Sequence, residues 1–345
     1  MSTVKTNAIL DASGGNTATI NSMTPTADSL QGFRNRIING AMMIAQRGTS
    51  AVTSSGSYPV DRFSITNTTD GAFSAQQDAT APTGFVNSLK YTVTTADSSL
   101  ASTQVAFVRH KIEGTNVSDL AWGSASAKTV TLSFQVRSSV TGTFGGALRN
   151  SADDRSYPFT YSISSANTWE TKSVTIAGDT SGTWLTTTGI GIQIIFSLGS
   201  GSSRVGTAGA WATAEYTGAT GETNLMATLN ATWYITGAQL EVGSVATPFE
   251  RRDYGRELAM CQRYAYKLGA ISLAKMRELD RSRVGFYVLP VEMRTAVTVP
   301  SISTTDAISV SISNQTTRGF TMYVLATADG MGADITSQAV VTAEL

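Results

Sequence analysis

Residues 128–138 read KTVTLSFQVRS, and this stretch decides the fold class. Its apolar side chains take every second position, at Val130, Leu132, Phe134 and Val136. Successive side chains of a β-strand point to opposite faces, so a period of two predicts a strand with one buried face and one face in water. We expect Phe134 to point into a hydrophobic core and Gln135 to point away from it.

The same alternation recurs along the chain and predicts at least eight strands. It is clearest at Leu89, Tyr91 and Val93, at Tyr157, Phe159, Tyr161 and Ile163, and at Ile190, Ile192, Ile194, Phe196 and Leu198. Clusters of Gly, Ser, Asn and Asp separate these segments, with no helical stretch between them. Short polar connections favour antiparallel pairing over parallel βαβ units. The sequence therefore predicts an all-β fold, a two-sheet β-sandwich or jelly roll.

Charge is scarce and balanced over the 345 residues. There are 25 basic and 25 acidic side chains, and charged residues make up 14% of the chain, against roughly 25% in an average globular protein. Binding to nucleic acid needs a basic surface that this composition lacks. No run approaches 18 apolar residues, and the first residues, MSTVKTNAIL, lack the apolar region of a signal peptide. We expect no nucleic-acid partner, no membrane insertion and synthesis in a cytoplasm.

The distribution of charge divides the chain. Residues 250–294 hold 16 of the 50 charged side chains, which marks a change of architecture. We predict four segments: a polar lead at 1–33, a β domain at 34–250, a charged helical connector at 251–283 and a small β domain at 284–345.

One helix is predicted, in RRDYGRELAMCQRYAYKL at residues 251–268. Its apolar stripe consists of Leu258, Cys261, Ala265 and Leu268. The next stretch, ISLAKMRELDRSR, fits either a second helix or a charged loop. Beyond it, short strands are expected at Phe286–Val288, Ala296–Val299, Ile308–Ile312, Thr321–Leu325 and Ala339–Val341.

Few residues offer catalytic or metal chemistry. The single Cys261 excludes an intramolecular disulfide, and the single His110 excludes a histidine metal cluster. We expect His110 to be structural and Cys261 to be a buried small hydrophobe. Asp153 and Asp154 are adjacent and are expected to form a solvated turn. The other acids are scattered, which leaves open a glycan hydrolase that uses two carboxylates.

The aromatic residues suggest the candidate site. Trp169 and Trp233 belong to predicted strands and are expected in the core. Trp184, Trp211 and Tyr216 lie in or beside glycine-rich loops, in GDTSGTWLTTTG and GTAGAWATAEYTG. There a ring can stack on a sugar, or it can pack at the rim of the core or against a neighbouring subunit. The first interpretation makes these three residues the expected ligand contacts.

Several phrases resemble the fibre and decoration proteins of tailed bacteriophages. They include the lead TNAILDASGGNTATINSMTPT, then FRNRIINGAMMIAQRGTS with YPVDRF, then NTWETKSVTIAGDTSGTW and ITGAQLEVGSVATPFERR, and finally ELAMCQRYAYK. The resemblance covers about residues 1–268, and the stretch from ATPFERR to ELAMCQRY is its most specific part. It implies a jelly roll like that of carbohydrate-binding modules, carried on a virion protein made in a bacterial host.

From this resemblance we expect a non-enzymatic virion structural protein, a homotrimeric tail or head fibre on the virion surface. Residues 1–33 would dock on other virion proteins, and the β domains would face host-surface glycans. Two alternatives remain: a capsid decoration protein that binds no glycan, and a glycan depolymerase. Carbohydrate-binding jelly rolls often hold a structural calcium ion near the last strand, where this chain offers only Glu241. We therefore expect no metal ion and no cofactor.

Overall fold

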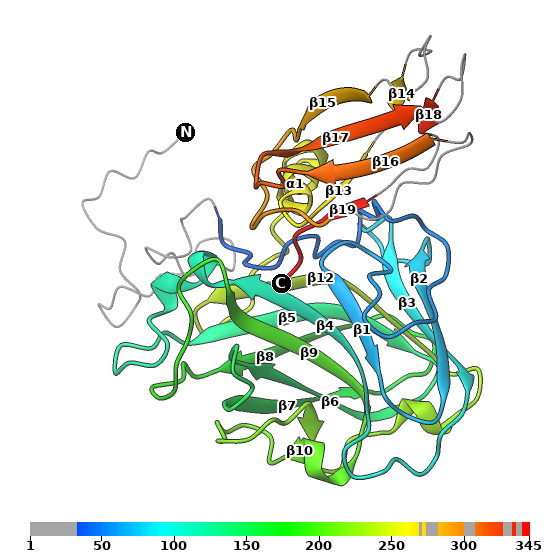
Figure 1. The fold of residues 1–345 in the computed structure, drawn as a ribbon. Helices are drawn as coiled ribbons and strands as arrows, with labels where there is room; N and C mark the ends of the chain where they lie inside the picture. Colours follow the sequence, from blue (N-terminus) through cyan, green and yellow to red (C-terminus); the bar gives the residue numbers. More distant parts are fainter. Residues whose placement is uncertain (1–32, 269–270, 274–281, 300–307, 327–332, 336–339) are drawn as a thin grey trace, which may run out of the picture.

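A computed structural model of the chain describes residues 33–268, 271–273, 282–299, 308–326, 333–335 and 340–345. Two five-stranded antiparallel sheets form a sandwich (Figure 1). The first sheet has the order β1 (Phe63–Asn67), β4 (Val105–Glu113), β9 (Ile190–Ser200), β6 (Gly142–Arg149) and β7 (Ser156–Ile163). The second sheet has the order β2 (Ala72–Asp78), β3 (Ser88–Thr95), β12 (Thr232–Val242), β5 (Val130–Ser138) and β8 (Glu170–Ile176). The predicted all-β jelly roll is confirmed.

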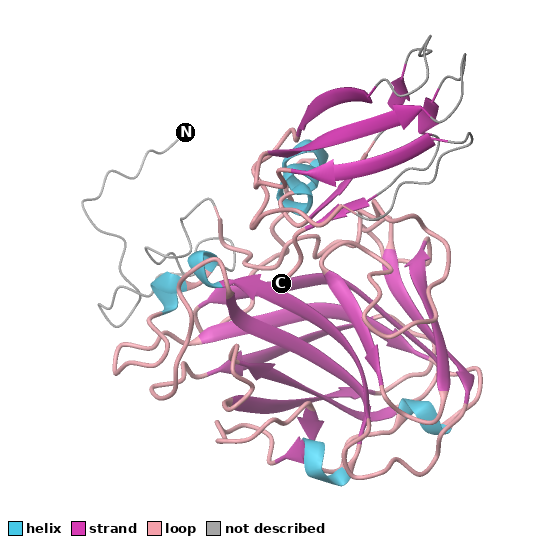
Figure 2. Cartoon of the chain, in the orientation of Figure 1, coloured by secondary structure: helices cyan, strands magenta, loops and turns pink. Residues whose placement is uncertain are grey.

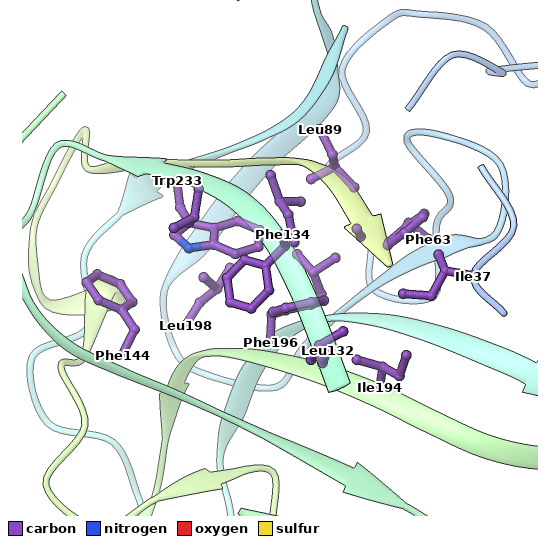
Figure 3. Close-up of a cluster of buried hydrophobic side chains, with 14 of the residues drawn as sticks. Ile37, Phe63, Leu89, Leu132, Phe134, Phe144, Ile194, Phe196, Leu198 and Trp233 are labelled. Carbon is purple, nitrogen blue, oxygen red and sulfur yellow. The ribbon is translucent and has the colours of Figure 1, made fainter. Parts of the chain in front are cut away.

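The core lies between the two sheets, and Figure 3 shows side chains from both sheets meeting there. Phe134 of β5 is 1% exposed, and its ring centroid lies 5.0 Å from that of Phe196 on β9. Trp233 of β12 is fully buried and donates its indole N–H to the Tyr161 hydroxyl at 3.2 Å. The prediction for β5 is confirmed, because Gln135 is partly exposed on the opposite face.

Strand β9 is buried on both faces. The alternating apolar residues of the sequence predicted burial of its inner face only. Ile194 and Phe196 point into the core, but Ile195 on the outer face is also fully buried. Residues 201–231, which include η3 (Ser202–Arg204), β10 (Val205–Gly206), β11 (Gly218–Ala219) and η4 (Leu225–Ala227), follow β9. Part of this segment covers the outer face, where Ser197 donates a hydrogen bond to the Glu222 carboxylate. The short strands β10 and β11, which pair with each other, and the loops around them supply this cover.

The helix is shorter than the sequence indicates. Helix α1 (Tyr254–Gln262) starts at Asp253, whose carboxylate caps the Arg256 amide at 2.9 Å. Ala265, predicted to lie on the helix, belongs instead to strand β13 (Ala265–Lys267). The chain leaves the helix so that the fully buried Tyr264 can donate its hydroxyl to Glu113 of β4 at 2.8 Å. This tertiary contact overrides the local helical pattern.

The C-terminal part is a small β unit with its own core, seen beside the sandwich in Figure 2. Its strands are β14 (Ile271–Leu273), β15 (Ser282–Val288), β16 (Ile308–Ser313), β17 (Gly319–Ala326), β18 (Ala333–Ile335) and β19 (Val340–Thr342). Four predicted strands correspond to β15, β16, β17 and β19. The fifth, Ala296–Val299, is no strand and makes only an isolated bridge from Thr298 to Thr342. Ile271–Leu273 is a strand, whereas most of the ambiguous stretch after it lies outside the described residues.

Charged side chains join this unit to the jelly roll. Glu113 has a fully buried side chain and accepts hydrogen bonds from Arg263 Nη2 at 2.7 Å and from Nε at 3.0 Å. Burial raises the pKa of Glu113, but the hydrogen bonds from Arg263 and Tyr264 outweigh burial and lower it. Arg62 pairs with Glu344 and lies over the Tyr264 ring. Buried pairs of this kind fix how the two parts dock.

Two predictions about how the chain is divided stay untested. The anchor predicted for residues 1–33 lies outside the described residues except for Phe33, and the four-segment division stays a prediction. Across the described residues, the structure holds no helix with the length and apolar character that a membrane crossing requires.

Candidate functional site

Trp184 and Trp211 come together at one end of the sandwich, and a third tryptophan joins them. Trp122 follows the short helices η1 (Gly114–Asn116) and η2 (Ser118–Leu120). The Trp122 ring centroid lies 4.7 Å from that of Trp184 and 5.4 Å from that of Trp211, and Trp184 and Trp211 are 5.4 Å apart. All three contacts are edge-to-face, the arrangement that aromatic pairs favour. The three rings form a rim cluster that closes the end of the core.

The indole N–H groups of the rim cluster are already used. Trp122 donates to the Lys128 carbonyl at 2.8 Å, Trp184 to the Ser181 carbonyl at 3.1 Å and Trp211 to the Ala177 carbonyl at 2.8 Å. The Trp211 bond joins two separate loops, whereas the bonds of Trp122 and Trp184 lie within their own loops. Since each indole has only one donor, none of the three can offer an N–H to a ligand.

A buried ion pair holds the loops of the rim cluster. Asp179, 1% exposed, accepts from Arg155 Nη2 at 2.7 Å and from Nε at 2.8 Å. The hydrogen bond to Asp179 raises the pKa of Arg155. Arg155 also donates to the Thr213 hydroxyl at 3.0 Å, two residues beyond Trp211. An ion pair and hydrogen bonds therefore join the loops around Trp184 and Trp211.

A small hollow, about 30 Å³ in volume, opens beside Trp122 and Trp184. Leu120, Leu185 and Ile192 supply its apolar wall, and Ser118 and Thr186 bring hydroxyl groups. Of the three residues predicted to contact a ligand, Trp184 lines this hollow, whereas Trp211 packs behind it.

Tyr216 is not part of the rim cluster. Its ring covers Gly206, where an added Cβ would lie 2.3 Å from Cδ2 of Tyr216. The Tyr216 amide lies 3.4 Å from the Ser156 hydroxyl. Among the described residues, no ring contact joins Tyr216 to the tryptophans. The structure thus separates Tyr216 from the other two predicted contacts.

A second aromatic group, which the sequence analysis missed, lies on the outer face of the second sheet. The rings of Trp169 and Tyr234 meet edge-to-face at 6.1 Å. The Arg137 guanidinium lies 5.0 Å from the centre of the Tyr234 ring, and the Lys90 ammonium lies 5.6 Å from it. We call these four residues the sheet-face cluster.

The register of the sheet explains how this cluster forms. Tyr234 pairs with Lys90 on one side and with Arg137 on the other. Glu170 pairs with Val136, which brings Trp169 beside Arg137. Trp169 was expected in the core, but it is partly exposed on the outer face. The expectation that Trp169 is a core residue is wrong; that for Trp233 is confirmed.

Polar groups of the sheet-face cluster remain available. In the described part of the chain, the indole N–H of Trp169 has no hydrogen-bond partner. Arg137 uses only Nε, which donates to the Asn167 carbonyl at 2.8 Å, and its two terminal nitrogens are unbonded within the described residues. Gln135 and Thr171 lie next to it and bond each other at 2.8 Å. The cluster presents a ring, an indole donor and a guanidinium on one surface.

Glu241, the acid considered as a calcium ligand, holds the loop that contains Thr247. Glu241 is 1% exposed and accepts from the Thr247 amide at 2.8 Å and the Thr247 hydroxyl at 2.5 Å. Arg34 Nε lies 3.3 Å from the same carboxylate. No group of three His, Cys, Asp or Glu side chains that could hold a metal ion occurs in the ranges that the structure describes.

His110 and Cys261 are both buried. His110 points into the core from β4, 4.7 Å from the Phe63 ring, and both of its ring nitrogens lack partners in the described structure. Burial and then the charge of Arg62 lower its pKa well below the usual value, which keeps the imidazole neutral. Burial raises the pKa of the Cys261 thiol well above its usual value. A thiol in this environment is a poor nucleophile, as expected from the sequence.

Three of the described acids are engaged in contacts within the chain. Asp153 forms an ion pair with Arg149 at 2.9 Å, and Asp154 accepts from the Asn150 amide at 2.6 Å. Burial raises the pKa of Glu222. Ser197 and the Ala219 amide hold the Glu222 carboxylate, so it is engaged in fixing the loop over β9.

Comparisons with known proteins give likeness of fold alone. No family model matches the chain, and no curated protein matches it. Among solved structures, a tailspike protein 4 domain of bacteriophage CBA120 is 11% identical over 61% of this chain and 22% of that one, with a TM-score of 0.34. A family 11 carbohydrate-binding module of Clostridium thermocellum is 10% identical over 57% of this chain and 96% of that one, with a TM-score of 0.29. A cellulose-binding domain of Cellulomonas fimi is 15% identical over 54% of this chain and 90% of that one, with a TM-score of 0.25. At these values, only the side chains of this chain can carry an assignment of function.

Proposed function

We propose that this chain is a non-enzymatic structural protein of a phage virion whose jelly roll binds host-surface glycans at the sheet-face cluster. The observation that carries the glycan site is the indole N–H of the partly exposed Trp169, which is unbonded among the described residues and lies beside the unbonded terminal nitrogens of Arg137. The virion assignment rests on the resemblance of residues 1–268 to fibre and decoration proteins.

The sheet-face cluster offers the contacts that a sugar needs. The apolar face of a pyranose can lie on the Trp169 ring while its hydroxyls accept hydrogen bonds from Arg137 and the indole N–H. Gln135 and Thr171 extend the polar surface along the sheet. A single open site of this kind is expected to bind weakly, at about millimolar Kd, which corresponds to about −4 kcal/mol.

Several copies would make such a weak site effective. A homotrimer presents three sites, and after the first contact the others form at high effective concentration. Trimerisation is part of this proposal, and a native mass of one chain at micromolar concentration would contradict it. Deleting residues 1–33 should leave a folded protein that fails to assemble on particles.

The hollow beside Trp184 is the second candidate for a glycan site. Its favouring observation is the pair of rings, Trp122 and Trp184, on the wall of the small hollow. We rank it below the sheet-face cluster because its indole donors are used by the backbone.

The test is a glycan array probed with the full-length protein, followed by binding measurements with Trp169→Ala and Trp184→Ala. Trp169→Ala should remove binding, and Trp184→Ala should retain it. Phe286→Ala is the matched control, since Phe286 is a 57% exposed aromatic on β15 of the other unit. Loss of binding in Trp184→Ala alone would move the site to the hollow.

Two outcomes would replace this function with a rival. An array with no hits, together with binding of the protein to capsids, would favour a decoration protein. Release of reducing ends from host polysaccharide, abolished by a single Asp or Glu substitution, would establish a depolymerase.

A further inference from the structure

The outer face of the first sheet carries a row of cations that the proposed function does not use. Lys111 on β4 and Arg149 on β6 both pair with Gln193 on β9, so the three residues cross neighbouring strands in one row. These strands lie side by side in Figure 1. Arg109 is two residues before Lys111 and therefore points to the same face.

Arg149 in this row is neutralised, but Arg109 is not. Arg149 pairs with Asp153 at 2.9 Å and with Glu215 at 3.2 Å. Arg109 forms no ion pair in the described part of the chain. Its Nη1 donates to the Gln193 side-chain oxygen at 3.2 Å, while its Nε is buried without an acceptor.

The guanidinium of Arg109 packs over the ring of Phe107. Its guanidinium lies 5.6 Å from the centre of the Phe107 ring, which is 4% exposed and packs on Ile195. Arg109 itself is partly exposed, and within the described residues its Nη2 makes no hydrogen bond. A fixed guanidinium with an unbonded terminal nitrogen is suited to bind an oxyanion.

Lys111 provides a second donor beside it. One of its three N–H groups contacts the main-chain oxygen of Leu345, and the other two have no acceptor in the described structure. Burial, then the charges of Arg109 and Arg62, lower the pKa of Lys111 to about 8, although Glu344 and Asp153 act in the opposite direction. The cations of Arg109 and Arg62 therefore lie near Lys111, together with the carboxylates of Glu344 and Asp153.

We propose that Arg109 and Lys111 bind an oxyanion on the outer face of the first sheet. The ligand is either the carboxylate of an acidic sugar or a phosphate group, since both present oxygen acceptors to a guanidinium and an ammonium. This site is separate from the sheet-face cluster, which lies on the other sheet, and its existence does not depend on neutral-glycan binding there.

The test follows the lysine side-chain NMR signals of the full-length protein during titrations with inorganic phosphate, glucuronate and glucose at constant ionic strength. The Lys111 signal is assigned with Lys111→Gln. Phosphate, glucuronate or both should raise the pKa of Lys111, and binding should weaken above pH 8. The effective anion identifies the source of the ligand. If neither anion moves the signal, the proposal is wrong.

Arg109→Gln should weaken anion binding at least tenfold and, without ligand, should raise the pKa of Lys111. The matched control is Arg318→Gln, which removes an exposed arginine from the other unit. Arg109→Lys should retain part of the affinity and shows whether charge or the guanidinium shape matters. Equal anion affinity in Arg109→Gln and the unaltered protein would overturn the proposal.

Discussion

The rim cluster and the sheet-face cluster are both built from aromatic side chains, yet their surroundings give them different roles. Trp122, Trp184 and Trp211 each donate to a backbone carbonyl, and their three rings pack against one another. Trp169 touches one ring, that of Tyr234, and is partly buried, as Trp184 and Trp211 also are. A glycine-rich setting is thus a weak sign of a ligand site. The state of the indole donor separates a structural tryptophan from one that a ligand can use.

Phe134 is an aromatic residue of the core, and its removal is expected to have the largest effect on the unfolding free energy. Phe134→Ala should cost about 3–5 kcal/mol of unfolding free energy, because it leaves a cavity among Phe196 and Tyr161 in the core. Gln135→Ala, one residue away on the outer face, should cost less than about 0.5 kcal/mol. Denaturant unfolding of both variants measures this difference, and equal costs would show that the β5 register is wrong.

Trp122 tests whether the rim cluster is structural. It is 9% exposed and touches both other rings of the cluster, so Trp122→Ala should cost about 3 kcal/mol, at the low end for a buried aromatic. Glycan binding by the remaining folded protein should not change. A cost below about 1 kcal/mol, or a loss of glycan binding at full stability, would place the rim cluster among the ligand contacts.

His110 tests what a buried aromatic ring without hydrogen-bond partners costs in stability. Its buried ring nitrogens have no partners within the described residues, so His110→Leu should stabilise the protein by about 1 kcal/mol at pH 7. Thermal or urea melts of the variant measure this gain. A destabilised variant would indicate that an internal water satisfies the imidazole.

The same residue predicts a pH dependence. Burial lowers the pKa of His110 in the folded state below the unfolded value of about 6.5, so below that pH the unfolded state binds a proton that the folded state does not. Stability should therefore fall on acidification below pH 6.5, by up to about 1.4 kcal/mol per pH unit from this group. His110→Leu should remove that part of the slope, and an unchanged slope would assign it to other groups.

The sheets were predictable because alternation is local. Phe134 and Trp233 could be placed in the core from their neighbours alone, since a strand with one wet face imposes a period of two. The same rule applies to Lys90 and Tyr234, which stand between the inward residues of their strands, but the sequence analysis did not use it to place them. Trp169 was assigned to the core because it is a large aromatic residue of a predicted strand. Its position in the strand register places it on the outer face instead.

The remaining errors come from contacts between distant parts of the chain. The helix ends before Ala265 because Tyr264 reaches Glu113, 151 residues away in sequence. The outer face of β9 is buried because a later loop places Glu222 over it. The rim cluster needed Trp122 as well as the two predicted tryptophans. No local pattern encodes such pairings, which depend on how the sandwich closes.

Trp169→Ala has the smallest expected effect on stability and the sharpest consequence for the comparison. The side chain is partly exposed and makes one ring contact, so its removal should cost about 1 kcal/mol or less. The same change should lower glycan affinity at least tenfold, because it removes both the stacking surface and the indole donor. Arg137→Gln should lower the affinity at a stability cost of about 1 kcal/mol or less, since it also removes the Nε bond to the Asn167 carbonyl and the contact over the Tyr234 ring. Unfolding curves and binding isotherms on the same samples give both quantities. A Trp169→Ala variant that loses as much stability as Trp122→Ala and keeps its glycan binding would mean that the two clusters do not differ in role, and that hydrogen-bond satisfaction is no guide to the binding site.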